Sequence, residues 1–178
     1  MTLNLYFMKI VLVGYMGAGK TAIGKILAEK MSLPFFDLDQ LIENEEKKTI
    51  ATIFDKKGEL YFRKLERKCL ENFLQVQQNY ILALGGGTPC YFDNFKLYQA
   101  DDITSIYLKA NTVTLVTRLV SNLQNRPLLQ NLDKEALTEF VAKHLFERNS
   151  YYNQVTFIQP TDENSIQEIS ETLFNQLA

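Results

Sequence analysis

The sequence has 178 residues, of which 46% are hydrophobic and 22% are charged. This composition suits one folded domain and is unlike that of a disordered chain. The formal net charge of −2 provides no field that would attract nucleic acid or an anionic membrane. The two cysteines and one histidine lack the spacing of a disulfide framework or a zinc site. We therefore expect a single domain over residues 1–178, a cytoplasmic location, and no nucleic-acid or membrane partner.

Strand and helix patterns alternate along the chain. Five runs rich in aliphatic, β-branched or aromatic residues are typical of strands, and they cover residues 9–14, 33–38, 80–84, 103–108 and 155–158. Apolar residues at helical spacing predict helices over 20–31, 41–48, 50–57, 59–74, 113–120, 134–151 and 165–177. The polar stretch 121–133 reads as a loop, and Gly58 separates two helices. The alternation predicts a three-layer α/β/α fold with a five-stranded parallel sheet and the first run at its centre.

The segment 14–21, G-Y-M-G-A-G-K-T, matches the phosphate-loop pattern G-x-x-x-x-G-K-[ST] between a strand and a helix. In such a loop, backbone N–H groups surround phosphate oxygens, the lysine reaches the outer phosphates, and the hydroxyl can ligate Mg²⁺. We therefore expect a nucleoside triphosphate and Mg²⁺ to be held by Gly14, Gly17, Ala18, Gly19, Lys20 and Thr21.

Two carboxylates and a run of glycines end the next two strands of the predicted sheet. Asp37 and Asp39 are two residues apart, so an extended backbone would point both to one face at the edge where α/β ligands bind. Asp37 would support Mg²⁺ and Asp39 would accept the proton of a substrate hydroxyl. The alternative is that Asp39 only caps the following helix. Three adjacent glycines, Gly85, Gly86 and Gly87, indicate backbone close to a ligand.

Arginine is scarce, with five residues against 14 lysines, so each arginine is a candidate for binding planar anions. Arg63 lies near acidic residues on its predicted helix and could serve a carboxylate substrate, as could Arg148. Arg126, in the predicted loop, could close on the transferred phosphate. Arg67 is expected to form a surface ion pair with Glu71.

Six ordered motifs give the chain a resemblance to shikimate kinases over nearly its whole length. They are G-Y-M-G-A-G-K-T, D-L-D-x-x-I-E at 37–43, G-E-x-x-F-R-x-x-E at 58–66, L-G-G-G at 84–87, R-P-L-L at 126–129 and R-x-x-Y at 148–151. The resemblance implies ATP with Mg²⁺ as cofactor, shikimate as substrate, and transfer of the γ-phosphoryl group to the 3-hydroxyl on the way to chorismate.

The same resemblance implies roles for single residues. Asp37 supports the metal with Thr21, and Asp39 binds the substrate hydroxyls and acts as the base. Arg63, Arg148 and the glycine triplet hold shikimate. Arg126 is the arginine of a lid over about 121–133, and Arg118 stacks near adenine.

Two other functions compete with this interpretation. One is another small kinase, acting on gluconate or a nucleoside monophosphate; no side chains for a nucleobase acceptor are evident in the sequence. The other is a catalytically silent nucleotide-binding regulator, which the retained Lys20, Thr21, Asp37, Asp39 and Arg126 disfavour. The expected oligomeric state is a monomer, since no coiled coil or obvious apolar patch is evident. His144, Cys69 and Cys90 are interpreted as structural residues.

Overall fold

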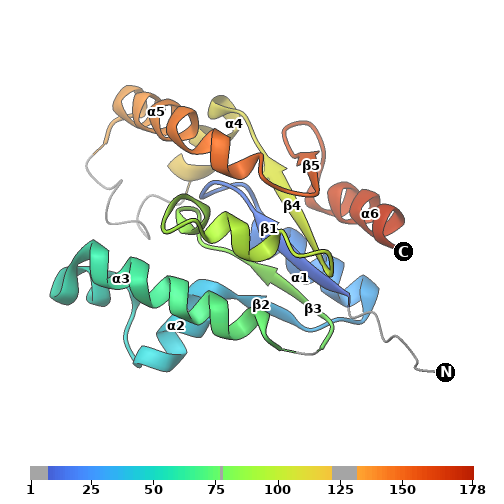
Figure 1. Ribbon diagram of the computed structural model, residues 1–178. Coiled ribbons are helices and arrows are strands. Elements are labelled where there is room, and N and C mark those ends of the chain that lie inside the picture. The colour runs from blue at the N-terminus through green and yellow to red at the C-terminus, as the bar shows by residue number, and fades with distance from the viewer. Residues whose placement is uncertain (1–7, 77, 122–131) are drawn as a thin grey trace.

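A five-stranded parallel sheet forms the centre of the protein (Figure 1), and its strand order is β2-β3-β1-β4-β5. The computed structural model describes residues 8–76, 78–121 and 132–178. The strands are β1 (Lys9–Val13), β2 (Phe35–Asp37), β3 (Tyr80–Ala83), β4 (Ile103–Lys109) and β5 (Phe157–Pro160). All five residues of β1 are buried between its parallel neighbours β3 and β4. The predicted fold class and the central position of this first strand are confirmed.

Helices cover both faces of the sheet (Figure 1). The helices are α1 (Lys20–Met31), α2 (Leu38–Glu46), α3 (Ile50–Leu74), α4 (Thr112–Val120), α5 (Lys134–Tyr152) and α6 (Ile166–Leu177). Helix α1 packs against α6, α2 against α3, and α4 against α5. Within α3 the backbone is non-helical at Gly58, with φ 77° and ψ 169°, so the predicted break there is confirmed. Two short 3₁₀ helices that were not predicted, Thr88–Cys90 and Asn94–Tyr98, follow β3.

The strand predicted over 33–38 is shorter in the structure, and this changes the position of Asp39. Strand β2 ends at Asp37, whose Oδ1 accepts a hydrogen bond from the N–H of Asp39 at 3.1 Å. That bond caps the first turn of α2. The expectation that both carboxylates extend from a strand is therefore wrong, because Asp37 caps the helix and Asp39 lies in its first turn.

The last strand also differs from its prediction over 155–158. Val155 precedes β5, and the N–H of Thr156 bonds to the carbonyl and hydroxyl of Ser105, at 3.0 Å each. The regular register with β4 starts only at Phe157 and continues to Pro160. Proline is tolerated there because β5 is an edge strand, where a missing N–H leaves no neighbouring strand unpaired.

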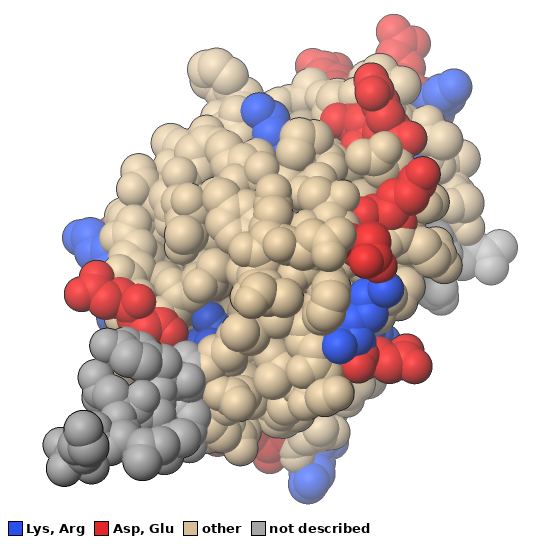
Figure 2. All heavy atoms as spheres, turned by 90° about the vertical axis from the view of Figure 1, so that its right-hand side faces the viewer, with Lys and Arg blue, Asp and Glu red and all other residues tan. Residues whose placement is uncertain are grey.

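In the face that carries β5 and α6, uncharged side chains occupy the middle, and acidic and basic side chains lie around its rim (Figure 2). Among the described residues, no helix is both long enough and apolar enough to span a membrane.

Candidate active site

A cavity of about 650 Å³ lies beside the phosphate loop. It brings together most of the residues that the sequence singled out, and its lining includes Gly17, Gly19, Lys20, Thr21, Asp37, Asp39, Arg63, Gly85, Gly86, Gly87, Arg118 and Arg148. Two of the expected loop residues, Gly14 and Ala18, lie outside this lining. Arg126 falls in the range 122–131, outside the described residues.

The phosphate loop connects β1 to α1 through three glycines with positive φ, namely Gly14, Gly17 and Gly19. Such angles are unfavourable for residues with a Cβ atom. The ammonium of Lys20 donates to the carbonyls of Gly14 at 2.7 Å and Tyr15 at 3.0 Å. Lys20 therefore lies against the loop at the N-terminus of α1, where helix N–H groups favour a bound anion.

Thr21 and Asp37 present neighbouring oxygens from two different elements. The Thr21 hydroxyl, on the first turn of α1, donates to Oδ2 of Asp37 at 3.0 Å. The other carboxylate oxygen of Asp37 caps α2. A hydroxyl and a carboxylate are oxygen ligands of the kind that Mg²⁺ prefers, so this pair fits that ion.

Asp39 is a carboxylate whose surroundings disfavour its charge. Burial, followed by the charges of Asp37 and Glu66, raises the pKa of Asp39 from 3.8 to about 6, although Lys20 and Arg63 act in the opposite direction. A carboxylate with a raised pKa that is still ionised at neutral pH is a suitable proton acceptor.

We expect the activity to fall in acid because Asp39 must be ionised to accept a proton. A plot of log kcat/KM for the acceptor against pH should bend near pH 6 and fall tenfold per unit below it. His144 also lines the cavity, so the profile of His144→Asn is the control. If the bend is unchanged in His144→Asn, it is assigned to the titration of Asp39. A parent profile that stays flat down to pH 5 contradicts the role of Asp39 as the base.

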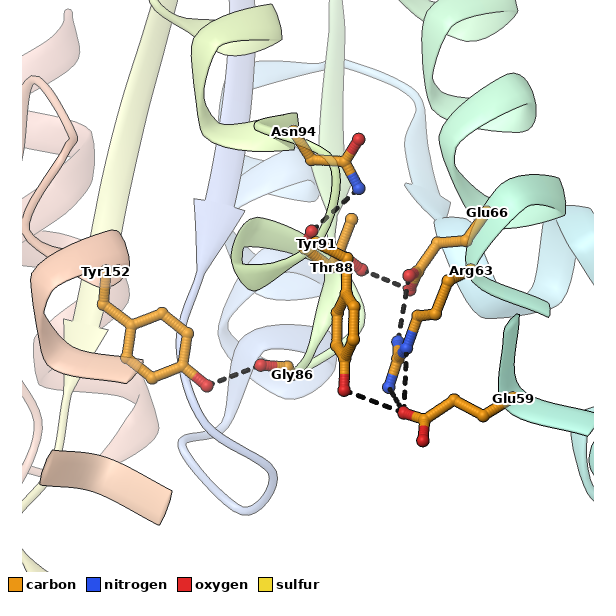
Figure 3. A network of polar contacts seen from close by, with 8 residues as sticks. All are labelled: Glu59, Arg63, Glu66, Gly86, Thr88, Tyr91, Asn94 and Tyr152. Atoms are coloured by element: carbon orange, nitrogen blue, oxygen red, sulfur yellow. Dashed lines mark hydrogen bonds and ion pairs between the residues drawn. The ribbon is translucent and has the colours of Figure 1, made fainter. Parts of the chain in front are cut away.

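The guanidinium of Arg63 is fixed by a polar network between α3 and the segment after β3 (Figure 3). Arg63 donates to Glu66 at 2.9 Å, and the Thr88 hydroxyl donates to the other oxygen of Glu66 at 2.6 Å. Only 1% of the Glu66 side chain is exposed. Arg63 also contacts Glu59 at 3.4 Å and lies 4.2 Å from the ring centroid of Tyr91. The prediction that acidic neighbours orient Arg63 is confirmed.

The glycine triplet leaves room for these side chains. A Cβ atom on Gly87 would lie 2.7 Å from Nη2 of Arg63, and one on Gly85 would lie 3.0 Å from Oδ1 of Asp39. The carbonyl of Gly86 accepts a hydrogen bond from the Tyr152 hydroxyl at 2.5 Å. The glycines therefore allow Arg63 and Asp39 to approach the backbone, a contact that glycine spacing alone does not predict.

Gly87→Ala should raise the acceptor KM about five- to tenfold and leave the ATP KM unchanged, because the new methyl group displaces the Arg63 guanidinium. The backbone angle at Gly87, φ −93°, suits alanine, so the substitution adds no backbone strain, and steady-state kinetics measures both KM values. Gly58→Ala is the control. Its Cβ meets no atom within 4 Å but φ is 77° there, so it should lower thermal stability and spare both KM values.

Arg148 reaches the cavity from α5, and its guanidinium carbon lies 5.6 Å from the ring centroid of Tyr15. The R-x-x-Y motif pairs Arg148 with Tyr151, but the fully buried tyrosine that bonds to Gly86 is the next residue, Tyr152. Consecutive side chains on an α-helix point about 100° apart, so Tyr151 and Tyr152 face different directions. No local sequence pattern distinguishes the two adjacent tyrosines.

The remaining arginines differ in their surroundings. Arg118, near the end of α4, donates to the carbonyl of Thr161 at 2.6 Å and to that of Gly17 at 3.3 Å. It is thus held beside the phosphate loop. Arg67 pairs with Glu71 at 2.6 Å, which confirms the expected ion pair.

Comparison with known proteins identifies the family. A family model described as shikimate kinase matches residues 16–178. This chain belongs to the shikimate kinase family. A shikimate kinase from Flavobacterium psychrophilum is 51% identical over 170 residues, which cover 93% of this chain and 99% of that protein.

Solved structures of shikimate kinases have the same fold. The enzyme from Bacteroides thetaiotaomicron matches with a TM-score of 0.88 and 34% identity, over 96% of this chain and 98% of the other. The enzyme from Acinetobacter baumannii, solved in complex with shikimate, matches with a TM-score of 0.84 and 29% identity, over 96% and 93% of the two chains. Shikimate kinases phosphorylate a hydroxyl of shikimate with ATP, so the resemblance drawn from the six motifs is confirmed.

Proposed function

We propose that the protein transfers the γ-phosphoryl group of ATP to the 3-hydroxyl of shikimate, giving shikimate 3-phosphate and ADP for chorismate and aromatic amino acid synthesis. One observation carries the proposal. A single cavity is lined both by Lys20 and Thr21 of the phosphate loop and by the carboxylate of Asp39 and the guanidinium of Arg63. Phosphate donor and hydroxy-acid acceptor thus have adjacent binding groups.

Lys20, the loop N–H groups and the N-terminus of α1 bind the phosphates of ATP, with Gly14, Gly17, Ala18 and Gly19 forming the loop. The Thr21 hydroxyl and Asp37 hold Mg²⁺, directly or through water, as their 3.0 Å contact supports. When bound, the ion neutralises charge on the phosphates. In this proposal Arg118 lies beside adenine, and Arg126, which falls outside the described residues, binds the transferred phosphate.

The acceptor lies on the other side of the cavity. Arg63 and Arg148 bind its carboxylate, and the backbone of Gly85, Gly86 and Gly87 lies alongside its ring. Asp39 accepts the proton of the 3-hydroxyl while that oxygen bonds to the γ-phosphorus and the bond from phosphorus to the ADP oxygen breaks. The raised pKa of Asp39 supports this role.

A coupled assay of ADP release against shikimate, gluconate and nucleoside monophosphates tests the proposal. We expect turnover with shikimate alone, loss of turnover when EDTA removes Mg²⁺, and product phosphorylated at the 3-hydroxyl by NMR. Turnover with gluconate or a nucleoside monophosphate, in place of shikimate, would contradict the assignment of shikimate as the acceptor. Nucleotide binding without phosphate transfer to any of them would favour the silent regulator.

The proposal includes a monomeric, cytoplasmic enzyme. The free thiols of Cys69 and Cys90 suit a reducing compartment. Light scattering during size-exclusion chromatography tests the oligomeric state, with the mass of one chain expected.

A further inference from the structure

Arg148 contacts an aromatic residue of the phosphate loop. Its guanidinium carbon lies 5.6 Å from the Tyr15 ring centroid, within the range of an attractive cation–π contact. Tyr15 is 1% exposed, so the ring side of the contact is shielded from water. A shift of this ring would therefore move the preferred position of the guanidinium.

Tyr15 is itself held at two points. Its carbonyl accepts a hydrogen bond from Lys20 at 3.0 Å. A second hydrogen bond, of 3.2 Å, joins its hydroxyl to Nδ1 of His144 on α5. The imidazole also packs on Phe140, with ring centroids 4.1 Å apart. The hydroxyl bond therefore links the phosphate loop to a ring that is fixed on α5.

His144 and Arg148 are four residues apart on α5 and share one face of that helix. The single side chain of Tyr15 thus contacts two successive turns, one through its hydroxyl and one through its ring. Burial and the charge of Arg148 lower the pKa of His144, against the opposing charge of Glu147. The lowered pKa favours the neutral imidazole, which avoids a second cation beside Arg148.

We propose that the Tyr15–His144 hydrogen bond positions Arg148 for the carboxylate of the acceptor. Tyr15 and His144 are positioning residues, which set acceptor affinity and take no part in phosphoryl transfer. This inference rests on the proposed function, in which Arg148 binds the acceptor carboxylate.

The test compares Tyr15→Phe, which removes the hydroxyl and keeps the ring, with His144→Leu, His144→Asn and the double variant Tyr15→Phe/His144→Leu. Loss of this partly buried hydrogen bond should raise the shikimate KM about three- to tenfold in Tyr15→Phe and in His144→Leu. We expect kcat and the ATP KM to stay within twofold. The double variant should be no worse than either single change, and His144→Asn should restore the affinity because its amide can bond to the hydroxyl.

Tyr107→Phe is the matched control. The Tyr107 hydroxyl donates to Asn149, the residue after Arg148 on α5, at 3.5 Å, so this variant loses a similar contact without touching the phosphate loop. Its shikimate KM should equal that of the parent. An unchanged shikimate KM in Tyr15→Phe overturns the positioning role. So does a fall in kcat and a rise in the ATP KM as large as the rise in the shikimate KM.

Arg148→Ala separates this inference from the proposed function. If Arg148→Ala weakens shikimate binding in calorimetry and Tyr15→Phe does not, only the positioning role fails. If Arg148→Ala leaves shikimate binding unchanged, the assignment of Arg148 to the carboxylate fails, and the positioning role fails with it.

Discussion

Asp39→Asn should lower kcat about 10²- to 10⁴-fold, the usual contribution of a positioned general base. The amide keeps the size of the carboxyl group but cannot take the hydroxyl proton. ADP affinity should stay unchanged, because the proposed function assigns the phosphates to Lys20 and the loop. Steady-state kinetics measures kcat, and titration calorimetry measures the affinity for ADP.

Thermal unfolding provides the control for Asp39→Asn. A carboxyl whose pKa is raised from 3.8 to about 6 in the folded state binds its proton more tightly folded than unfolded. Its contribution to folding is therefore most favourable below pH 3.8, declines as the pH rises towards about 6, and levels off above that pH. At pH 7.5 the ionised Asp39 disfavours folding, so Asp39→Asn should have a Tm equal to or above that of the parent. Turnover within threefold of the parent would remove Asp39 as the base.

Arg63→Ala should weaken shikimate binding by about 2 kcal/mol or more, roughly 30-fold, since it removes a charged hydrogen-bonding partner from a largely buried site. It should also destabilise the fold. Glu66 is 1% exposed, and the substitution removes the ion pair of 2.9 Å that Glu66 forms with Arg63, at a cost of about 3 kcal/mol. Calorimetry with shikimate and urea unfolding measure the two effects.

A second substitution distinguishes weakened binding from weakened folding. Arg63→Ala combined with Glu66→Gln removes both charges, so most of the lost stability should return while shikimate binding stays weak. Thr88 can still bond to the glutamine oxygen. If the combined variant binds shikimate like the parent, Arg63 is not a ligand of the acceptor.

Patterns that repeat over several residues were predictable from the sequence. The five buried residues of β1, the glycine loop and the Gly58 break each follow from local side-chain types and backbone angles. The Arg63 contacts with Glu59 and Glu66 follow from helical spacing.

The unpredicted features depend on contacts between distant segments. Thr88 meets Glu66 across 22 residues, Tyr152 meets Gly86 across 66, and Tyr15 meets His144 across 129. No local pattern encodes such pairs. The error at Asp39 has a different cause, because one side-chain cap at Asp37 ended the strand earlier than the run of apolar residues indicated.

The two oxygens of Asp37 serve different neighbours, one the N–H of Asp39 and the other the hydroxyl of Thr21. Replacing Asp37 with alanine would therefore remove both the helix cap and the contact with Thr21. A fall in activity would then not report the loss of the cation alone. Asparagine is the more informative choice, because it is as good a helix cap as aspartate. It also removes a negative neighbour of Asp39, so the acid side of the rate profile would move to lower pH and reveal how strongly the two sites influence each other.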